Sequence, residues 1–450
     1  MSGYTPHTDA DVASMLGFLG LSSLDELFAV VPEALRLAGG LDLPEGLPEP
    51  DVFARMQDLA AANRPCGRDL VCFAGAGAYD HEVPPVTRAL ASRSEFVTSY
   101  TPYQPEVAQG VLQAVFEFQT LVARLSGLAV SNASLYDGAA SLVEAVNLAV
   151  GATGRHDVWV SHGINPSWRE VLATFAAGTG HQVHDVPLVG GSTDWAATVF
   201  DDLDDPGAVV VAYPNYLGCL EDLAEARAVC DRTGALLLVA FDPICAGILR
   251  SPGDWGADVV VGEGQALGMP LSFGGPYLGL FACTMDQVRR LPGRLVGETV
   301  DAEGRRAYVT TLRAREQDIR RERATSNVCT NQTLMAVTAA IQLGWLGTSG
   351  ISEVALRSAR GARYCRQGLL GVPGVEPLTT TPIVREFAIR LPIDAEMAVE
   401  RLADEGFLAG VALGPSYTDG HSDGLLVAVT ERRTRMEIDA FVSTFEKAVR

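Results

Sequence analysis

The chain has 450 residues, of which 48% are hydrophobic, so it is long enough for a deep core and for two domains with an additional arm. Its net charge of −21 argues against nucleic-acid binding, which would need a basic face. No apolar run reaches the roughly 18 residues of a membrane span, and the N-terminal residues show neither a basic start nor an apolar signal segment. We therefore expect a cytoplasmic globular protein with no nucleic-acid or membrane partner.

Eight cysteines and seven histidines are scattered along the chain, without a C-x-x-C pair or an H-E-x-x-H spacing. Without an export signal, reduced and mostly buried thiols are expected. His181 and His184 are three residues apart, but they flank a predicted short strand over 182–186. We therefore predict no metal site.

The first part of the chain is predicted to be helical, with two short amphipathic helices within 8–38 and a third over 51–62. A segment of this size is too small to hold a site, and we expect it to wrap a neighbouring chain. The predicted organisation is therefore a helical N-terminal arm (1–65), a large α/β domain (66–345) and a small C-terminal α/β domain (346–450).

An aromatic, amide-rich turn over 99–105 opens onto a predicted helix over 111–125. Its two prolines forbid a regular helix at the turn itself. Such a turn is suited to lining a small polar pocket. A packed loop that its tyrosines merely anchor explains the same residues equally well, so both interpretations stay open here.

A polar loop from residue 132 leads into a helix that is expected to end near 149. Helix starts bind anions because free N–H groups and the helix dipole point outward. Asp137 places a carboxylate at this start, which would cap the helix and disfavour a phosphate. The sequence therefore favours a helix cap over an anion site.

From residue 158 onward, strands and helices alternate, which predicts a mostly parallel sheet between layers of helices. The strands are expected over 158–161, 182–186, 208–212, 236–241 and 258–261. Asp242 follows one of them directly. Ligands in such sheets bind just beyond the carboxyl ends of the strands, so Asp242 should face a ligand crevice.

An arginine-rich run follows at 313–323, with five arginines in eleven residues. A solvated face with internal ion pairs is the default interpretation of such a run. The same arginines could equally hold a carboxylate or a phosphate.

The segment 236–282 resembles pyridoxal phosphate (PLP) enzymes of the aspartate aminotransferase type. In those enzymes one strand ends in an acid that pairs with the pyridine nitrogen, and the next delivers a lysine for the Schiff base. Here Asp242 supplies the acid, but the only lysine of the chain is Lys447, the fourth residue from the end. We therefore predict an α/β fold of the PLP-dependent transferase type that has no Schiff-base residue of its own.

Five segments together resemble the glycine decarboxylase P-protein of the glycine cleavage system, in its N-terminal half, which in many bacteria is a separate subunit 1. These segments are 73–81, 99–109, 132–138, 262–276 and 315–332. Arg323 stands where the family usually has lysine, and Ala140 stands where a threonine is common. The match spans most of the chain.

The resemblance implies a partner, subunit 2, that carries PLP on its own lysine, in a heterotetramer of two copies of each subunit. Glycine would bind to that PLP, lose its carboxyl group as carbon dioxide and pass its aminomethyl group to the lipoyl arm of the H-protein. PLP acts as the electron sink for such a decarboxylation. On this basis the chain is expected to be one subunit of a glycine dehydrogenase (aminomethyl-transferring).

Because this chain lacks the lysine, it is expected to complete the pocket of its partner across an interface. The candidate pocket residues are Tyr100, Thr101, Tyr103 and Gln104, with Gly274 and Gly275 approaching the partner's cofactor. Two alternatives stay open. The chain could be a purely structural scaffold for subunit 2, or a self-sufficient enzyme that binds PLP non-covalently through Asp242 and the helix start at Gly138.

Overall fold

The computed structural model describes residues 6–37, 39, 41–196 and 205–450. The chain divides into two compact units, Met1–Arg64 and Pro65–Arg450. We call the first the arm and the second the body. The body spans both of the α/β domains expected from the sequence, so the boundary placed between 345 and 346 stays a prediction.

The arm contains two α-helices, α1 (Asp9–Leu19) and α2 (Glu49–Ala61). Where a second helix was expected within 8–38, there are two 3₁₀ turns instead, Leu24–Phe28 and Glu33–Leu35. That prediction is therefore wrong in detail. The reason is local, because Pro32 separates the two turns and no side chain caps the start of either.

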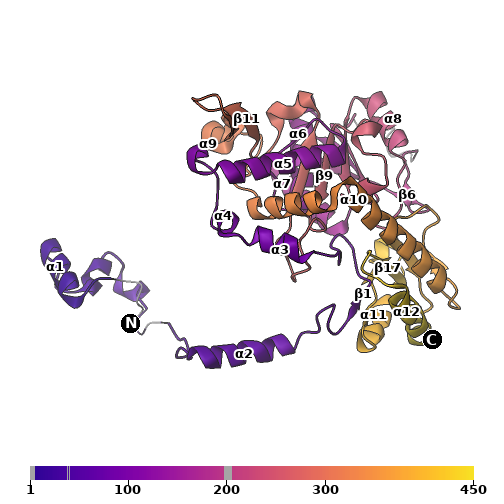
Figure 1. The fold of residues 1–450 in the computed structure, drawn as a ribbon, viewed down its shortest axis with the longest axis horizontal. Helices are drawn as coiled ribbons and strands as arrows, with labels where there is room; N and C mark the ends of the chain where they lie inside the picture. The colour runs from indigo at the N-terminus through magenta and orange to yellow at the C-terminus, as the bar shows by residue number, and fades with distance from the viewer. Residues whose placement is uncertain (1–5, 38, 40, 197–204) are drawn as a thin grey trace. The chain divides into compact units, whose positions relative to one another are not determined.

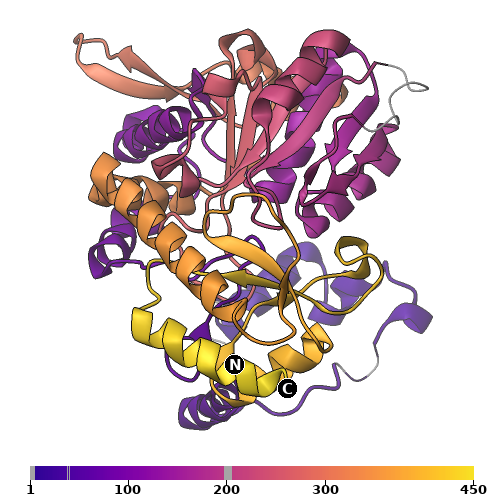
Figure 2. The same cartoon turned by 90° about the vertical axis from the view of Figure 1, so that its right-hand side faces the viewer.

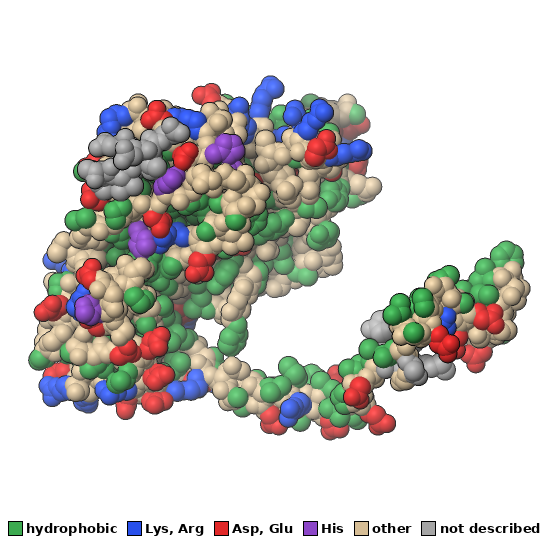
Figure 3. Space-filling model, turned by 180° about the vertical axis from the view of Figure 1, so that it is seen from behind, with side chains coloured by type: hydrophobic (Ala, Val, Ile, Leu, Met, Phe, Trp, Pro, Cys, Tyr) green, Lys and Arg blue, Asp and Glu red, His purple; other side chains and the backbone are tan. Residues whose placement is uncertain are grey.

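None of the described residues of the arm has a buried side chain. Hydrophobic side chains are exposed along its surface (Figure 3). The largest of them include Phe18, Phe28, Val30, Leu35 and Phe53. The arm therefore has no core of its own, and its apolar side chains remain available to another surface.

A seven-stranded sheet forms the centre of the body, in the order β2-β10-β9-β8-β7-β3-β4. The strands are β2 (Val130–Ser131), β3 (Asp157–Ser161), β4 (Gln182–Val186), β7 (Ala208–Tyr213), β8 (Leu236–Phe241), β9 (Val259–Glu263) and β10 (Gly279–Cys283). Neighbouring strands from β4 to β9 are parallel, whereas β10 is antiparallel to both β9 and β2. The prediction of a mostly parallel sheet is confirmed.

Helices cover both faces of this sheet (Figures 1 and 2). They include α5 (Gln109–Ser126), α6 (Gly138–Thr153), α7 (Pro166–Thr179) and α8 (Leu223–Thr233). Alternate residues of one strand enter different cores, because successive side chains point to opposite faces. Val209 and Val211 pack with residues of α5 and α8, whereas Val210 packs with residues of α6 and α7.

A second, antiparallel sheet lies in the C-terminal part of the body, in the order β13-β14-β17-β16. Its strands are β13 (Glu376–Pro377), β14 (Glu386–Arg390), β16 (Val411–Ala412) and β17 (Gly424–Ala428). The helices α11 (Ala395–Asp404) and α12 (Arg435–Ala448) share a core with it. A short parallel pair, β1 (Val71–Cys72) with β15 (Phe407–Leu408), adds Phe73 to the same core.

The longest helix, α10 (Thr333–Leu369), bends at Gly347, whose φ of 60° and ψ of −174° are not helical. The apolar spacing of the sequence predicts two helices here, over 333–346 and 352–369, and Gly347 is the break between them. Of the described helices, α10 alone is long and apolar enough to cross a membrane by length and composition. In the body it packs against α5, α12 and α3 (Pro85–Ala91).

One hairpin was not expected from the sequence, β11 (Val296–Val300) paired with β12 (Arg306–Thr310). Each strand has only five residues and neither carries an apolar run of four, so their pattern does not distinguish them from a loop. Other short elements are α4 (Ser94–Val97), α9 (Gln317–Arg320), β5 (Leu188–Val189) and β6 (Ser192–Thr193).

Candidate functional site

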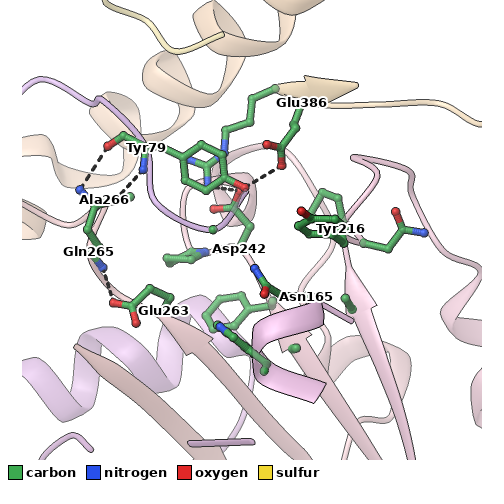
Figure 4. Close-up of a pocket in the computed structure, with 17 residues that line it drawn as sticks. Tyr79, Asn165, Tyr216, Asp242, Glu263, Gln265, Ala266 and Glu386 are labelled. Carbon is green, nitrogen blue, oxygen red and sulfur yellow. Dashed lines mark hydrogen bonds and ion pairs between the residues drawn. The ribbon is translucent and has the colours of Figure 1, made fainter. Parts of the chain in front are cut away.

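A crevice lies at the carboxyl ends of the parallel strands of the large sheet (Figure 4). Its cavity has a volume of about 90 Å³. The side chains around it include Tyr79, Asn165, Trp168, Tyr216, Asp242, Glu263 and Glu386. As predicted from the strand pattern, the acid that follows β8 faces this crevice.

The carboxylate of Asp242 is already bound by groups of this chain. Its Oδ2 forms an ion pair with Nη2 of Arg385 at 2.6 Å, and its Oδ1 accepts a hydrogen bond from the backbone N–H of Ile244 at 2.9 Å. The guanidinium of Arg385 lies over the ring of Tyr79, 3.4 Å from its centroid, and a further nitrogen contacts His81. Arg385 therefore holds the position at the acid that a pyridine nitrogen would need.

Tyr79 is fixed from several sides. Its hydroxyl donates to Oε2 of Glu386 at 2.8 Å, and its backbone N–H donates to Oε1 of Gln265 at 2.9 Å. Glu386 also accepts from the N–H of Ala76 at 2.7 Å. Burial raises the pKa of Glu386 to about 7 and raises the pKa of the Tyr79 hydroxyl. The ring of Tyr79 is thus held in a fixed position in the wall of the crevice.

The start of α6 is closed by two carboxyl groups. Oδ1 of Asp137 accepts from the N–H of Ala140 at 2.8 Å, and Oε2 of Glu263 accepts from the N–H of Gly138 at 2.9 Å. A Cβ at Gly138 would lie 2.1 Å from Trp168, so the indole packs directly on this turn. The predicted helix cap is confirmed, and a phosphate would meet carboxyl oxygens here.

This crevice does not fit PLP. The acid is paired with Arg385, the helix start is occupied by acids, and no lysine lines the cavity. Lys447 lies on α12 and is exposed. The Schiff-base carrier that the fold uses elsewhere is therefore not assembled in the crevice of this chain.

The predicted pocket residues 100–104 lie elsewhere, in the turn between α4 and α5, and none of them lines the crevice. The side chain of Tyr100 is 79% exposed and that of Tyr103 is 55% exposed. Gln104 is exposed, and Oγ1 of Thr101 is buried without a hydrogen-bond partner among the described residues. The turn thus presents its aromatic rings to the outside of the body.

A buried arginine ties this turn to two other segments of the sequence pattern. The Nη2 group of Arg294 donates to the Tyr103 hydroxyl at 3.1 Å and to the carbonyl of Cys329 at 3.0 Å, while its Nη1 donates to Oδ1 of Asn331 at 3.0 Å. Asn331 donates in turn to the carbonyl of Ala133 at 2.7 Å. We call these residues the Arg294 cluster. It brings the segments 99–109, 132–138 and 315–332 together.

Gly274 and Gly275 lie in the loop between β9 and β10. A Cβ at Gly274 would meet nothing within 4 Å, so the backbone there faces open space. Gly275 has a φ of 135°, which L side chains rarely adopt. Beside them the side chain of Phe273 is 92% exposed. This loop, like the 100–104 turn, is directed away from the chain's own crevice.

Comparison with known proteins decides the family. The model of the glycine cleavage system P-protein family matches residues 2–445. The chain is 46% identical over 440 residues to the probable glycine dehydrogenase (decarboxylating) subunit 1 of Moorella thermoacetica, covering 98% of each chain. It is 44% identical to the protein of the same name from Chloroherpeton thalassium, covering 99% of each.

The chain belongs to the glycine cleavage system P-protein family. A crystal structure of glycine decarboxylase (P-protein) in an inhibitor-bound form superposes with a TM-score of 0.91 at 45% identity, covering 99% of both chains. The sphingosine-1-phosphate lyase of Burkholderia pseudomallei is only 15% identical but has a TM-score of 0.66. The fold of the PLP-dependent transferases and the family resemblance are both confirmed.

The sequence of this P-protein chain did not reveal the roles of Arg294 and Arg385. Arg385 pairs with Asp242 at the crevice, and Arg294 binds the hydroxyl of Tyr103 in the 100–104 turn. Arg385 directly precedes β14, a position equally common for a solvated side chain. The available indication of Arg385 was Asp242 itself, because an acid at the buried end of a strand requires a cation. The sequence does not say which of the chain's arginines reaches it.

The substitution Arg385→Met should lower the free energy of unfolding by about 3–5 kcal/mol, because it leaves the charge of Asp242 buried and unpaired. Arg357→Met removes an exposed ion pair with Glu353 and should cost less than about 1 kcal/mol. Chemical denaturation measures both. Equal, small losses in the two variants would contradict a central role for the buried pair.

Proposed function

We propose that this chain is the subunit of glycine decarboxylase that carries no PLP, and that subunit 2 holds the cofactor on a lysine of its own. The observation that carries this proposal is the ion pair of Asp242 with Arg385, which removes the acid that PLP would need. The same ion pair argues against a self-sufficient enzyme that binds PLP non-covalently through Asp242 and the helix start at Gly138.

The two chains together act as a glycine dehydrogenase of the glycine cleavage system, which decarboxylates glycine and transfers its aminomethyl group to the lipoyl group of the H-protein. We expect a cytoplasmic heterotetramer with two copies of each subunit. Membership in the P-protein family and the names of the relatives support this assignment.

The contribution of this chain to the reaction is proposed to come from its outward-facing loops. Tyr100, Thr101, Tyr103 and Gln104 would form one wall of the partner's pocket, and Gly274 with Gly275 would approach the partner's cofactor. The exposure of the Tyr100 and Tyr103 rings on one turn supports this, because aromatic side chains are enriched at protein–protein interfaces.

The Arg294 cluster gives such a wall its rigidity. The Tyr103 hydroxyl accepts from a buried guanidinium that two further acceptors hold in place, so its position is set before a partner binds. A polar wall of fixed geometry would exclude water from the reacting carbon and keep its own dipoles oriented. A purely structural scaffold would need the same interface but not the hydroxyl groups. Removing a hydroxyl should therefore lower activity only if this chain completes the partner's pocket.

The location of the cofactor can be tested by reduction. In the reconstituted complex, borohydride treatment should attach a pyridoxyl group to a lysine of subunit 2 and leave this chain unlabelled. The matched control is Lys447→Arg, which should keep both the labelling pattern and the activity. High-occupancy labelling of Lys447, lost together with activity in Lys447→Ala, would contradict the proposal.

The arm should be required for assembly. The double substitution Phe18→Glu and Phe53→Glu places charges where two exposed rings would be buried on the partner. Losing about 3 kcal/mol of apolar burial should weaken the complex roughly 100-fold, as measured by light scattering during size exclusion. Phe175→Glu changes an exposed ring on α7 and serves as the control. Unimpaired assembly of the double variant would argue against this role of the arm.

The pocket and scaffold interpretations differ for Tyr103→Phe. If the hydroxyl faces the reaction, glycine–bicarbonate exchange should fall by about 10²–10³-fold, in addition to the small loss of stability that the missing hydrogen bond with Arg294 causes under either interpretation. A merely structural hydroxyl would cost about 1 kcal/mol of stability and leave exchange intact.

The matched control is Tyr364→Phe, which removes a 2.6 Å hydrogen bond from the Tyr364 hydroxyl to Asp439 on α12. It should leave exchange unaltered. Full exchange activity in Tyr103→Phe, Tyr100→Phe and Gln104→Ala would favour the scaffold.

A further inference from the structure

A hollow outside the crevice is lined by cations. It has a volume of about 290 Å³. Its lining residues are Arg289, Arg290, Arg315, Arg320, Arg323 and Thr325. We call it the arginine hollow. Two segments form it, the 3₁₀ helix Met285–Arg290 after β10 and the arginine-rich run around α9. Figure 3 shows basic side chains gathered at the edge of the body where Figure 1 places β11 and α9.

Internal ion pairs account for only part of this run. Arg313 pairs with Asp318 at 3.0 Å, and Arg323 approaches Glu322 at 3.8 Å with both side chains largely exposed. No ion pair with a described acidic side chain is formed by Arg289, Arg290, Arg315 or Arg320. Internal ion pairs, the default interpretation of this run, therefore do not neutralise most of the arginines that line the hollow.

Arg315 is the strongest indication that an acceptor belongs here. Its Nη1 group donates to the carbonyl of Leu291, but its Nε and Nη2 groups are buried and have no acceptor among the described residues. Its sequence neighbour Glu316 lies beyond ion-pair distance, and burial raises the pKa of that carboxyl. A buried charged group with unmade hydrogen bonds is costly, so these two groups of Arg315 call for an acceptor that the described side chains do not supply.

The charge of the hollow selects the class of ligand. Five arginine side chains line one cavity, and their positive charges repel each other, on a chain whose net charge is −21. A phosphate dianion neutralises more of this charge than a single carboxylate does, and its oxygens match the paired N–H groups of arginine. The hydroxyl of Thr325 adds a neutral donor at the rim.

We propose that the arginine hollow is a binding site for a phosphate group, either as the free ion or as a phosphomonoester of a small molecule. The volume is close to the lower end of small-molecule pockets, which suits a phosphate with a short organic part. No step of glycine decarboxylation is needed for this inference, so it stands or falls separately from the proposed function.

Isothermal titration calorimetry of the full chain tests the proposal, in a buffer free of phosphate and sulfate. Inorganic phosphate and glycerol phosphate are titrated separately, each at constant ionic strength set with sodium chloride, because screening alone would mimic weak binding. We expect saturable binding of one equivalent of at least one of the two. Tighter binding of glycerol phosphate would identify a phosphorylated metabolite as the source, and tighter binding of inorganic phosphate the free ion.

Two variants locate the binding. Arg315→Gln should weaken it about tenfold or more, because it removes the buried donors. Arg320→Gln alters an exposed side chain and should not disturb folding, so it serves as the test if Arg315→Gln fails to fold. It should also weaken phosphate binding. Arg357→Gln, an exposed arginine on α10, should bind as the unaltered chain does. Absence of saturable binding, or unchanged affinity in Arg320→Gln, would overturn the proposal.

Discussion

The buried ion pair of Asp242 with Arg385 is the constraint on which the body depends. Asp242 directly follows β8 of the large sheet, and Arg385 precedes β14 of the small one, so this ion pair joins the two sheets. A buried carboxylate without a cation would be strongly destabilising, and the same holds for the guanidinium. The second sheet must therefore lie over the crevice of the first.

The same pair accounts for the poor fit of PLP to the crevice of this chain. The acid is kept, but its partner is a side chain, and Tyr79 stacks on that side chain where a cofactor ring would otherwise need room. Glu263 closes the helix start in the same way. These contacts within the crevice contribute to the stability of the body.

Sequence patterns predicted the features that depend on neighbouring residues. The apolar runs that form β7 and β8, and the cap of α6 by Asp137, needed only local spacing and chemistry. Family motifs identified the fold and the family. The partners of Asp242 and Tyr103 were missed because each is an arginine far away in the sequence, and no local pattern distinguishes Arg385 or Arg294 from a solvated arginine.

The Arg294 cluster shows why the distinctive segments of the sequence are scattered and yet act together. The guanidinium of Arg294 fastens the 100–104 turn to the segment around Asn331, and Asn331 fastens that segment to the loop before α6. Each segment alone is a loop with little regular structure to hold it. A buried cation with three neutral acceptors makes the three loops one rigid surface, and a rigid surface can meet a partner without first losing conformational entropy.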